Sequence, residues 1–139
     1  MAIPIRQIMT PNPIRLAASA PIRDAARAMR QNDIGDVVVE KDGKLCGIVT
    51  DRDIVVRAIA EDKDVRTTSL ESICSREPVS LTPEQTDEDA VRIMRDKAVR
   101  RLPVVERGKV IGIVSLGDLA TQKDRQSALG HISAAAANV

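Results

Sequence analysis

Two short elements in the sequence combine a hydroxyl group, a carboxylate and a preceding apolar run. They are Gly47–Asp53, with the sequence GIVTDRD, and Gly112–Asp118, with the sequence GIVSLGD. In each, a Thr or Ser ends the apolar run and an Asp follows three residues later. Backbone N–H groups and a hydroxyl at a helix N-terminus can bind a phosphate or ribose oxygen, and a carboxylate can accept hydrogen bonds from ribose hydroxyls. The residue types therefore allow a nucleotide-binding element.

The same spacing has a structural interpretation. Ser/Thr-x-x-Asp is also the pattern of a helix capping box, which needs no ligand. A single copy would favour the cap. Two copies facing one another across a shared cleft would favour binding, and the same residues could serve both purposes.

A basic pair, Arg100 and Arg101, precedes the apolar run Leu102–Val105. The planar guanidinium group can pair with two phosphate oxygens at once. Adjacent charges are also typical of a solvated strand edge. The pattern alone leaves both interpretations open.

These residues belong to an internal repeat with a fixed offset of 65 residues. Aligning Ile5–Val55 with Leu70–Ala120 needs no gap, and 15 of the 51 aligned positions are identical. The chain is therefore two copies of one unit. We predict repeat 1 over residues 3–62, repeat 2 over residues 68–123, and a flexible C-terminal tail over residues 124–139.

The hydrophobic pattern predicts a strand, a helix, two strands and a helix in each copy. Apolar residues at helical spacing predict the first helix, through Ile22, Ala25, Ala26 and Met29 in repeat 1 and through Ala90, Val91 and Met94 in repeat 2. In repeat 2 the residues Thr82–Gln85 predict its start, with a Thr cap, Pro at the first helical position and Gln three residues after the cap.

Each copy then shows the pattern of a β-hairpin. Two β-branched runs flank a polar turn at Lys41–Lys44 in repeat 1 and at Glu106–Lys109 in repeat 2. A last helix is predicted to start at Thr50 and at Ser115. One unit of about 55 residues would bury too little apolar surface alone, so we expect an α+β fold of two βαββα repeats, packed face to face with pseudo-two-fold symmetry.

The composition argues against several classes of protein. A formal net charge of +1 creates no global attraction to nucleic acid or to an anionic membrane. Phe, Tyr and Trp are absent, so no aromatic platform exists for single-stranded nucleic acid. The longest apolar runs are too short to span a bilayer, and Met1–Met9 lacks the apolar segment of a secretory signal. We expect a cytoplasmic protein with neither nucleic-acid binding nor membrane insertion.

Catalytic and metal-binding patterns are missing from the sequence. The single histidine, His131, falls in the predicted tail, and no nucleophile triad, Walker loop or Cys/His metal spacing occurs. We predict no enzymatic activity, no catalytic cofactor and no metal site. Cys46 and Cys74 do not form a disulfide framework and are interpreted as reduced structural thiols; a redox pair would require the two positions to meet in space.

Together, the fixed offset, the GIVTxxD and GIVSxxD elements and the run Val99–Val105 (VRRLPVV) resemble a tandem pair of cystathionine-beta-synthase (CBS) domains, or Bateman module, of the small stand-alone bacterial type. The resemblance covers residues 3–122. It implies a non-catalytic regulatory module that binds AMP, ATP or S-adenosylmethionine in clefts between the repeats and controls a separate enzyme or transporter. The alternative is a ligand-free platform for dimerisation or docking.

The resemblance also implies which residues line the clefts. The stronger cleft takes Thr10, Ile14, Ile34 and Gly35 from repeat 1 with Arg100, Arg101, Ile113, Ser115 and Asp118 from repeat 2. In it, three isoleucines would sandwich the purine, Asp118 would hold the ribose and the two arginines would face the phosphate. The second cleft takes Ser75, Val79 and Val99 with Gly35, Asp36, Thr50 and Asp53.

The second cleft is predicted to be weaker. Gly35 and Asp36 stand there in place of the two arginines, and a carboxylate repels a phosphate at close range. Arg52, where repeat 2 has Gly117, could compensate in part.

A homodimer is expected from the last helix of each repeat, as the family commonly forms. These helices carry more apolar residues than one repeat's core is expected to use, namely Ile54, Val55, Ala58, Ile59 and Leu119.

Overall fold

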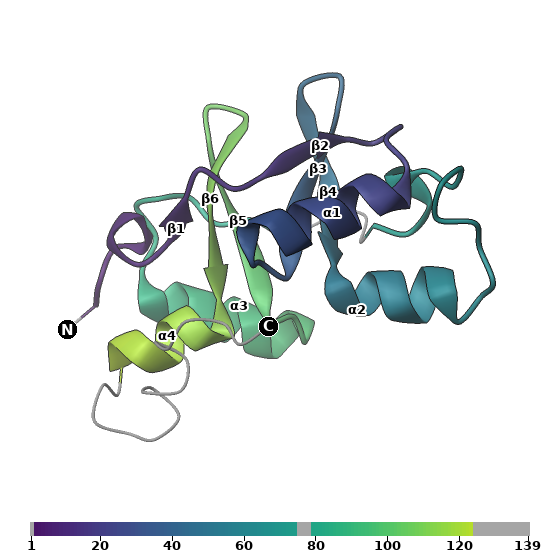
Figure 1. Ribbon diagram of the computed structural model, residues 1–139. Helices are drawn as coiled ribbons and strands as arrows, with labels where there is room; N and C mark the ends of the chain where they lie inside the picture. Colours follow the sequence, from purple (N-terminus) through teal and green to yellow (C-terminus); the bar gives the residue numbers. More distant parts are fainter. Residues whose placement is uncertain (1, 75–78, 124–139) are drawn as a thin grey trace. The chain divides into compact units, whose positions relative to one another are not determined.

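The computed structural model describes residues 2–74 and 79–123 (Figure 1). The chain divides into two compact units. Unit 1 joins the N-terminal residues up to Asn12 to the segment that begins at Val79, and unit 2 begins at Pro13. The predicted tail, including His131, and Ser75 lie outside the described residues.

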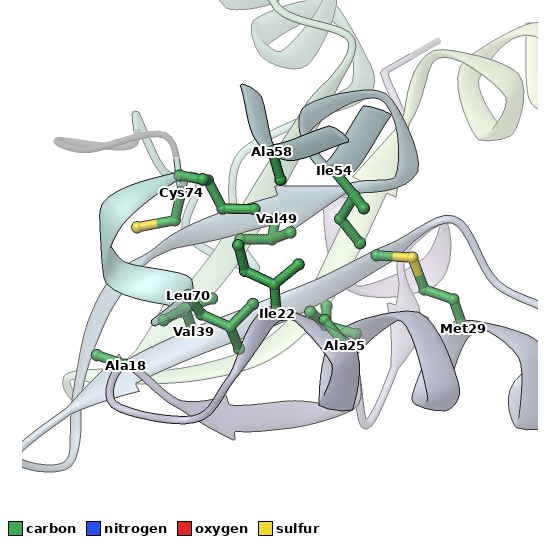
Figure 2. Close-up of a cluster of buried hydrophobic side chains, with 12 residues drawn as sticks. Ala18, Ile22, Ala25, Met29, Val39, Val49, Ile54, Ala58, Leu70 and Cys74 are labelled. Atoms are coloured by element: carbon green, nitrogen blue, oxygen red, sulfur yellow. The ribbon is translucent and has the colours of Figure 1, made fainter. Parts of the chain in front are cut away.

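Unit 2 contains the sheet β2-β3-β4 and its helices. Its elements are β2 (Arg15–Ala17), α1 (Ile22–Asn32), β3 (Asp36–Lys41), β4 (Lys44–Thr50), α2 (Asp51–Ile54), a π-helical continuation (Val55–Ile59) and a 3-10 turn, η3 (Leu70–Ser72). β2 runs parallel to β3, and β3 and β4 form an antiparallel hairpin. Side chains from α1, β4 and η3, among them Ile22, Val49 and Leu70, meet in one buried cluster (Figure 2).

Unit 1 is built on the same plan. Its elements are a 3-10 turn, η1 (Ile5–Gln7), β1 (Thr10–Pro11), α3 (Asp87–Lys97), β5 (Arg101–Glu106), β6 (Lys109–Ser115) and α4 (Leu116–Lys123). β5 and β6 form an antiparallel hairpin, and β1 pairs antiparallel with the other edge of β6. The first strand of this copy is reduced to one parallel bridge between Leu81 and Val104, where repeat 1 has β2. The predicted α+β fold and the order of elements are confirmed.

The leading segment of each sequence repeat packs in the unit of the other repeat. In unit 1 the Ile5 N–H donates to the Gln85 carbonyl at 2.7 Å, and in unit 2 the Leu70 N–H donates to the Ala20 carbonyl at 2.9 Å. The two hydrogen bonds are related by the 65-residue offset. The boundaries of the compact units therefore differ from those of the sequence repeats, because each unit contains the leading segment of the other repeat. As a result, Thr10 lies in the same unit as Ser115 and Asp118.

The predicted start of the second-repeat helix is wrong by one turn. α3 begins at Asp87, where Thr86 and Asp89 form a complete capping box. Thr82 and Gln85 instead close a separate turn, in which the Thr82 N–H donates to the Gln85 side chain at 2.9 Å. Both sequences satisfy the capping pattern, and three acidic residues in the first turn favour the later start because they complement the helix dipole.

Two residues assigned to the apolar helix stripes are exposed. Ala26 and Val91 face away from the cores, whereas Ala25 and Met94 are buried with the other predicted stripe residues. The hairpins are confirmed, since Gly43 and Gly108 adopt positive φ angles of 75° and 79° in their turns.

The expected surplus of apolar residues in the last helices is only partly present. Ile54, Ala58 and Leu119 belong to the cores of their own units, with exposed fractions of 8%, 0% and 3%. Val55 and Ile59 are exposed, as predicted. The α2 helix packs one side on its own sheet and turns the other outward.

A buried carboxylate fixes the N-terminal segment of unit 1. Asp87 is 2% exposed, its Oδ1 accepts from the Ile3 N–H at 3.0 Å, and its own N–H donates to the Ile3 carbonyl at 2.9 Å. Repeat 1 has Ile22 at the equivalent position. Asp87 thus anchors the segment that continues into β1.

Replacing Asp87 with Ala should destabilise unit 1 by about 1.5–3 kcal/mol, because the partly buried N–H groups of Ile3 and Glu88 lose a charged acceptor. Chemical denaturation measures this loss, and hydrogen exchange should show faster exchange at Ile3 and Ile5. The control Asp87→Asn keeps one acceptor oxygen and should lose less. Equal stability of Asp87→Ala and the parent would contradict this anchoring role.

Candidate functional site

Ser115 and Asp118 form a closed hydrogen-bonded pair where β6 passes into α4. The Ser115 N–H donates to Asp118 Oδ2 at 2.8 Å, and the Asp118 N–H donates to Ser115 Oγ at 3.1 Å. This is a reciprocal capping box. The structural interpretation of the motif is therefore confirmed. The second carboxylate oxygen of Asp118, Oδ1, takes no part in this capping box.

The arginine pair lies beside this cap. Arg101 is directly opposite Ser115 in the β5–β6 ladder, and the Leu116 N–H donates to the Arg100 carbonyl at 2.8 Å. The first residue of α4 is thereby tied to the residue that precedes β5. Arg100 is exposed and Arg101 is half-buried. Unit 1 therefore places two arginines, a serine and an aspartate next to one another at one end of a β-hairpin.

Thr10 and Ile113 complete the part of the predicted stronger cleft that lies in unit 1. Thr10 is exposed on β1 and pairs with Ile113 on β6. Ile113 is 6% exposed and alternates along β6 with Val114, which enters the core of this unit. Six of the predicted residues are thus in one unit, namely Thr10, Arg100, Arg101, Ile113, Ser115 and Asp118.

The other three residues of the predicted stronger cleft belong to unit 2. Ile14 is half-buried against that unit's core, and Ile34, 36% exposed, follows the left-handed residue Asp33 that ends α1. Gly35 precedes β3, and its carbonyl accepts from the Asp51 N–H at 3.0 Å. Gly35 is the counterpart of Arg100 in this contact.

The corresponding cap of unit 2 uses Thr50 and Asp53. The Thr50 N–H donates to Asp53 Oδ2 at 2.9 Å, and the Asp53 N–H donates to Thr50 Oγ1 at 3.1 Å. Asp36 lies opposite Thr50 in the β3–β4 ladder, in the place that Arg101 takes in unit 1. Arg52 is exposed on the first turn of α2.

Arg57 is a residue that the sequence analysis missed. Its Nε lies 3.8 Å from Asp53 Oδ1, in an ion pair between residues four apart on the helix. The equivalent position in repeat 2 is the uncharged Gln122. The spacing of Asp53 and Arg57 could have indicated this pair, which gives the carboxylate of unit 2 a cationic neighbour that its counterpart in unit 1 does not have at that position.

The two remaining residues assigned to the weaker cleft lie in unit 1. Val79 and Val99 are half-buried and pack against the hydrophobic core of that unit. The Val99 N–H donates to the Met94 carbonyl at 3.1 Å and closes the end of α3.

The described residues, 2–74 and 79–123, contain neither a cluster of metal ligands nor a membrane-spanning helix. No three His, Cys, Asp or Glu side chains of this part of the chain gather as metal ligands would. None of its helices has the length and apolar character needed to cross a bilayer.

Comparisons with known proteins agree on one family. The CBS domain model matches the chain twice, at residues 5–59 and 70–123. The CBS domain-containing protein YhcV of Bacillus subtilis is 36% identical over 133 residues, which cover 93% of this chain and 94% of YhcV. The uncharacterized protein YlbB of the same organism is 36% identical over 118 residues, covering 81% and 79% of the two chains.

Solved structures show the same fold. The crystal structure of the CBS domain NE2398 has a TM-score of 0.80 and 30% identity, and the match covers 91% of this chain and 100% of that one. A hexameric CBS-CP12 protein from bloom-forming cyanobacteria has a TM-score of 0.82 and 29% identity, covering 89% and 70%. CBS-domain pairs are generally non-catalytic regulatory modules that often bind adenosine ligands. With two family matches and two units of the same plan, this chain belongs to the CBS-domain family.

Proposed function

We propose that this CBS-domain pair is a non-catalytic sensor of an adenine nucleotide of the AMP or ATP type, acting in the cytoplasm on a separate enzyme or transporter. The observation that carries the proposal is the cluster at the end of the β5–β6 hairpin. There Arg101 lies opposite Ser115, and Asp118 keeps one carboxylate oxygen outside the capping box. Guanidinium groups suit a phosphate, and a carboxylate suits ribose hydroxyls.

The asymmetry between the units supports unit 1 as the main anion-binding unit. It carries Arg100 and Arg101, whereas unit 2 has Gly35 and Asp36 at the same positions. In unit 2 the carboxylate of Asp53 is also engaged by Arg57. Phosphate binding is therefore expected to depend mainly on residues of unit 1.

A thermal-shift panel of AMP, ADP, ATP, NADH, S-adenosylmethionine and adenosine tests the proposal. A ligand at 100 times its Kd stabilises the protein by about 2.7 kcal/mol and raises the melting temperature measurably. We expect the largest shifts with AMP or ATP and a small one with S-adenosylmethionine, whose sulfonium is cationic. If none of these compounds raised the melting temperature, nucleotide sensing would be contradicted and the ligand-free platform favoured. The observation that supports the platform is that both capping boxes are closed without a ligand.

We also propose that the chain forms a homodimer through the exposed face of α2 and its π-helical continuation. Val55, Val56 and Ile59 are 56%, 44% and 58% exposed and lie within five consecutive residues. Leu116 on α4 is 51% exposed. The hexameric CBS-CP12 neighbour supports self-association as a property of similar folds.

Light scattering at micromolar concentration should give about twice the chain mass of 15.0 kDa. Replacing Val55 and Ile59 with Asp should shift the mass towards the monomer, because charges would be buried in an apolar contact. Arg66→Asp, on an exposed residue outside this helix, should leave the dimer intact. A parent protein that is monomeric would exclude this assembly.

A further inference from the structure

The two cysteines of the chain meet in unit 2. Cys46 Sγ and Cys74 Sγ are 3.8 Å apart, although the residues are 28 positions apart in the sequence. Cys46 is half-buried on β4, and Cys74 is 4% exposed just after η3. The two sulfur atoms are in contact as thiols, which is the spatial condition that a redox pair requires.

A β-bulge presents the Cys46 side chain. In the β3–β4 ladder Gly47 pairs with Val39 and Leu45 pairs with Glu40, so Cys46 is the extra residue between them. Such a bulge redirects a side chain relative to the regular ladder. It allows Cys46 to meet a residue beyond the edge of its own strand.

Cys74 is held at the other side of the contact by the turn that precedes it. Its N–H donates to the Leu70 carbonyl at 3.0 Å, and its thiol lies 3.7 Å from the Glu71 carbonyl. Its side chain lies at one end of the hydrophobic cluster, with Met29 at the other end (Figure 2). Only a local movement of Cys74 is needed to bring its sulfur within bonding distance of the Cys46 sulfur.

Unit 1 has the same two positions without sulfhydryl groups. The 65-residue offset relates Cys46 to Ile111 and Cys74 to Met9, and both of these pack against the core of unit 1. Apolar side chains therefore occupy both positions in unit 1. Thiol chemistry is therefore confined to one of two equivalent sites.

A cation lies near the more accessible thiol. Lys41 Nζ is 2.8 Å from Glu71 Oε1. The pKa of Lys41 is raised chiefly by this hydrogen bond and ion pair with Glu71, and Cys46 adds a smaller electrostatic contribution. Lys41 and Cys46 therefore lie close enough to interact electrostatically.

We propose that Cys46 and Cys74 form a reversible intramolecular disulfide and make unit 2 a site of thiol oxidation by hydroperoxides. The Cys46 thiolate attacks a peroxide oxygen, so an S–O bond forms, the O–O bond breaks and the leaving hydroxide takes a proton to become water. Cys74 sulfur then attacks the sulfenic sulfur: the S–S bond forms, the S–O bond breaks, and the released hydroxide takes the Cys74 proton. Two thiols and one hydrogen peroxide give one disulfide and two waters.

The geometry requires a modest approach of the two sulfurs. The S–S bond length is about 2.05 Å, so the gap of 3.8 Å must close by less than 2 Å. Rotation of the Cys46 side chain and a shift of the turn at Leu70–Cys74 can supply this movement. A disulfide exchanger with suitable thiols reverses the reaction.

The pair also adjoins the cap of unit 2. The Ile73 carbonyl, next to Cys74, accepts from Arg57 Nη1 at 3.3 Å, and Arg57 is the partner of Asp53. Closing the disulfide moves the chain beside this contact. The redox state of the cysteines is thereby connected with the electrostatics around Asp53, whether or not a nucleotide binds.

The test treats the full chain with stoichiometric hydrogen peroxide under native conditions. We expect a mass loss of about 2 Da, titratable thiols falling from two to none, and a monomer-length band on a non-reducing gel. Trypsin should release one linked species joining residues 45–52 to residues 67–76. Dithiothreitol should restore both thiols, and oxidation should raise the melting temperature by about 5–10 °C.

Variants separate the disulfide from general oxidation. Cys74→Ser should stop at a Cys46 sulfenic acid that a dimedone probe traps, and Cys46→Ser should react much more slowly because its remaining thiol is buried. The double variant Cys46→Ile and Cys74→Met places the pair of unit 1 in unit 2 and should show no peroxide-dependent melting shift. Should that variant fail to fold, Cys46→Ala replaces it as the control.

Three results would overturn the proposal. The first is an oxidised product with both cysteines modified separately, and the second is a disulfide between two chains. The third is a Cys46–Cys74 link that forms only in denaturant. Each would show that the 3.8 Å contact does not lead to a native disulfide.

Discussion

Replacing Arg100 and Arg101 together with Gln is expected to weaken AMP or ATP binding by about 10- to 100-fold and leave adenosine binding almost unchanged. Arg101 begins β5 and Arg100 precedes it, next to the cap of α4. Gln keeps hydrogen-bonding atoms and removes the two charges that attract a phosphate. The ratio of nucleotide to adenosine affinity, measured by calorimetry, isolates that contribution.

A matched control removes two charges from the other end of the same hairpin. Arg107→Gln with Lys109→Gln gives the same change in net charge, at exposed positions around the β5–β6 turn. This control should bind nucleotide nearly as the parent does. High salt should reduce the difference between parent and the Arg100/Arg101 variant, since exposed charges are screened. If that variant binds AMP as tightly as the parent, the arginines are ordinary surface charges.

The reciprocal change tests why unit 2 is expected to bind anions weakly. Asp36 stands opposite Thr50 as Arg101 stands opposite Ser115. Asp36→Arg should remove a repulsion and strengthen binding of a second anionic ligand. An unchanged stoichiometry of one nucleotide per chain, with no gain in affinity, would mean that something other than this charge keeps the second site weak.

The repeat and its hairpins were predictable because they depend on local patterns. Runs of β-branched and other apolar residues, with the turn glycines Gly43 and Gly108, specify the strands, and the 65-residue offset transfers each assignment to the other copy. The capping residues of the last helices were also correctly placed. A capping box involves only residues three apart, so sequence spacing contains its geometry.

Features that depend on distant residues were not predictable. The exchange of leading segments relies on hydrogen bonds such as Ile5 to Gln85, and no pattern within either segment specifies its partner. The contact of Cys46 with Cys74 requires a bulge in one strand and a turn 28 residues later. The start of α3 was misplaced because two consecutive segments, Thr82–Gln85 and Thr86–Asp89, satisfy the same cap pattern, and tertiary pairing of Asp87 with Ile3 distinguishes them.

Asp118→Ala is expected to reduce adenine-nucleotide affinity by about 1–3 kcal/mol, or roughly 5- to 150-fold, because an acceptor for ribose hydroxyls is lost. Asp118 also caps α4, so this variant should melt at a lower temperature as well. Asp118→Asn separates the two effects, since its amide oxygen can still accept from the Ser115 N–H. Asn should restore much of the stability and less of the affinity for ribose.

The same pair of substitutions at Asp53 provides the internal comparison. Asp53→Ala should cost similar helix stability, because its capping hydrogen bonds match those of Asp118 within about 0.1 Å. Its effect on nucleotide affinity should be smaller, because Arg57 already engages the carboxylate and Asp36 opposes an anion nearby. Calorimetry on the four variants, with melting temperatures recorded in parallel, separates capping from binding. Equal affinity losses at the two positions, or a larger loss at Asp53, would reverse the ranking of the two units.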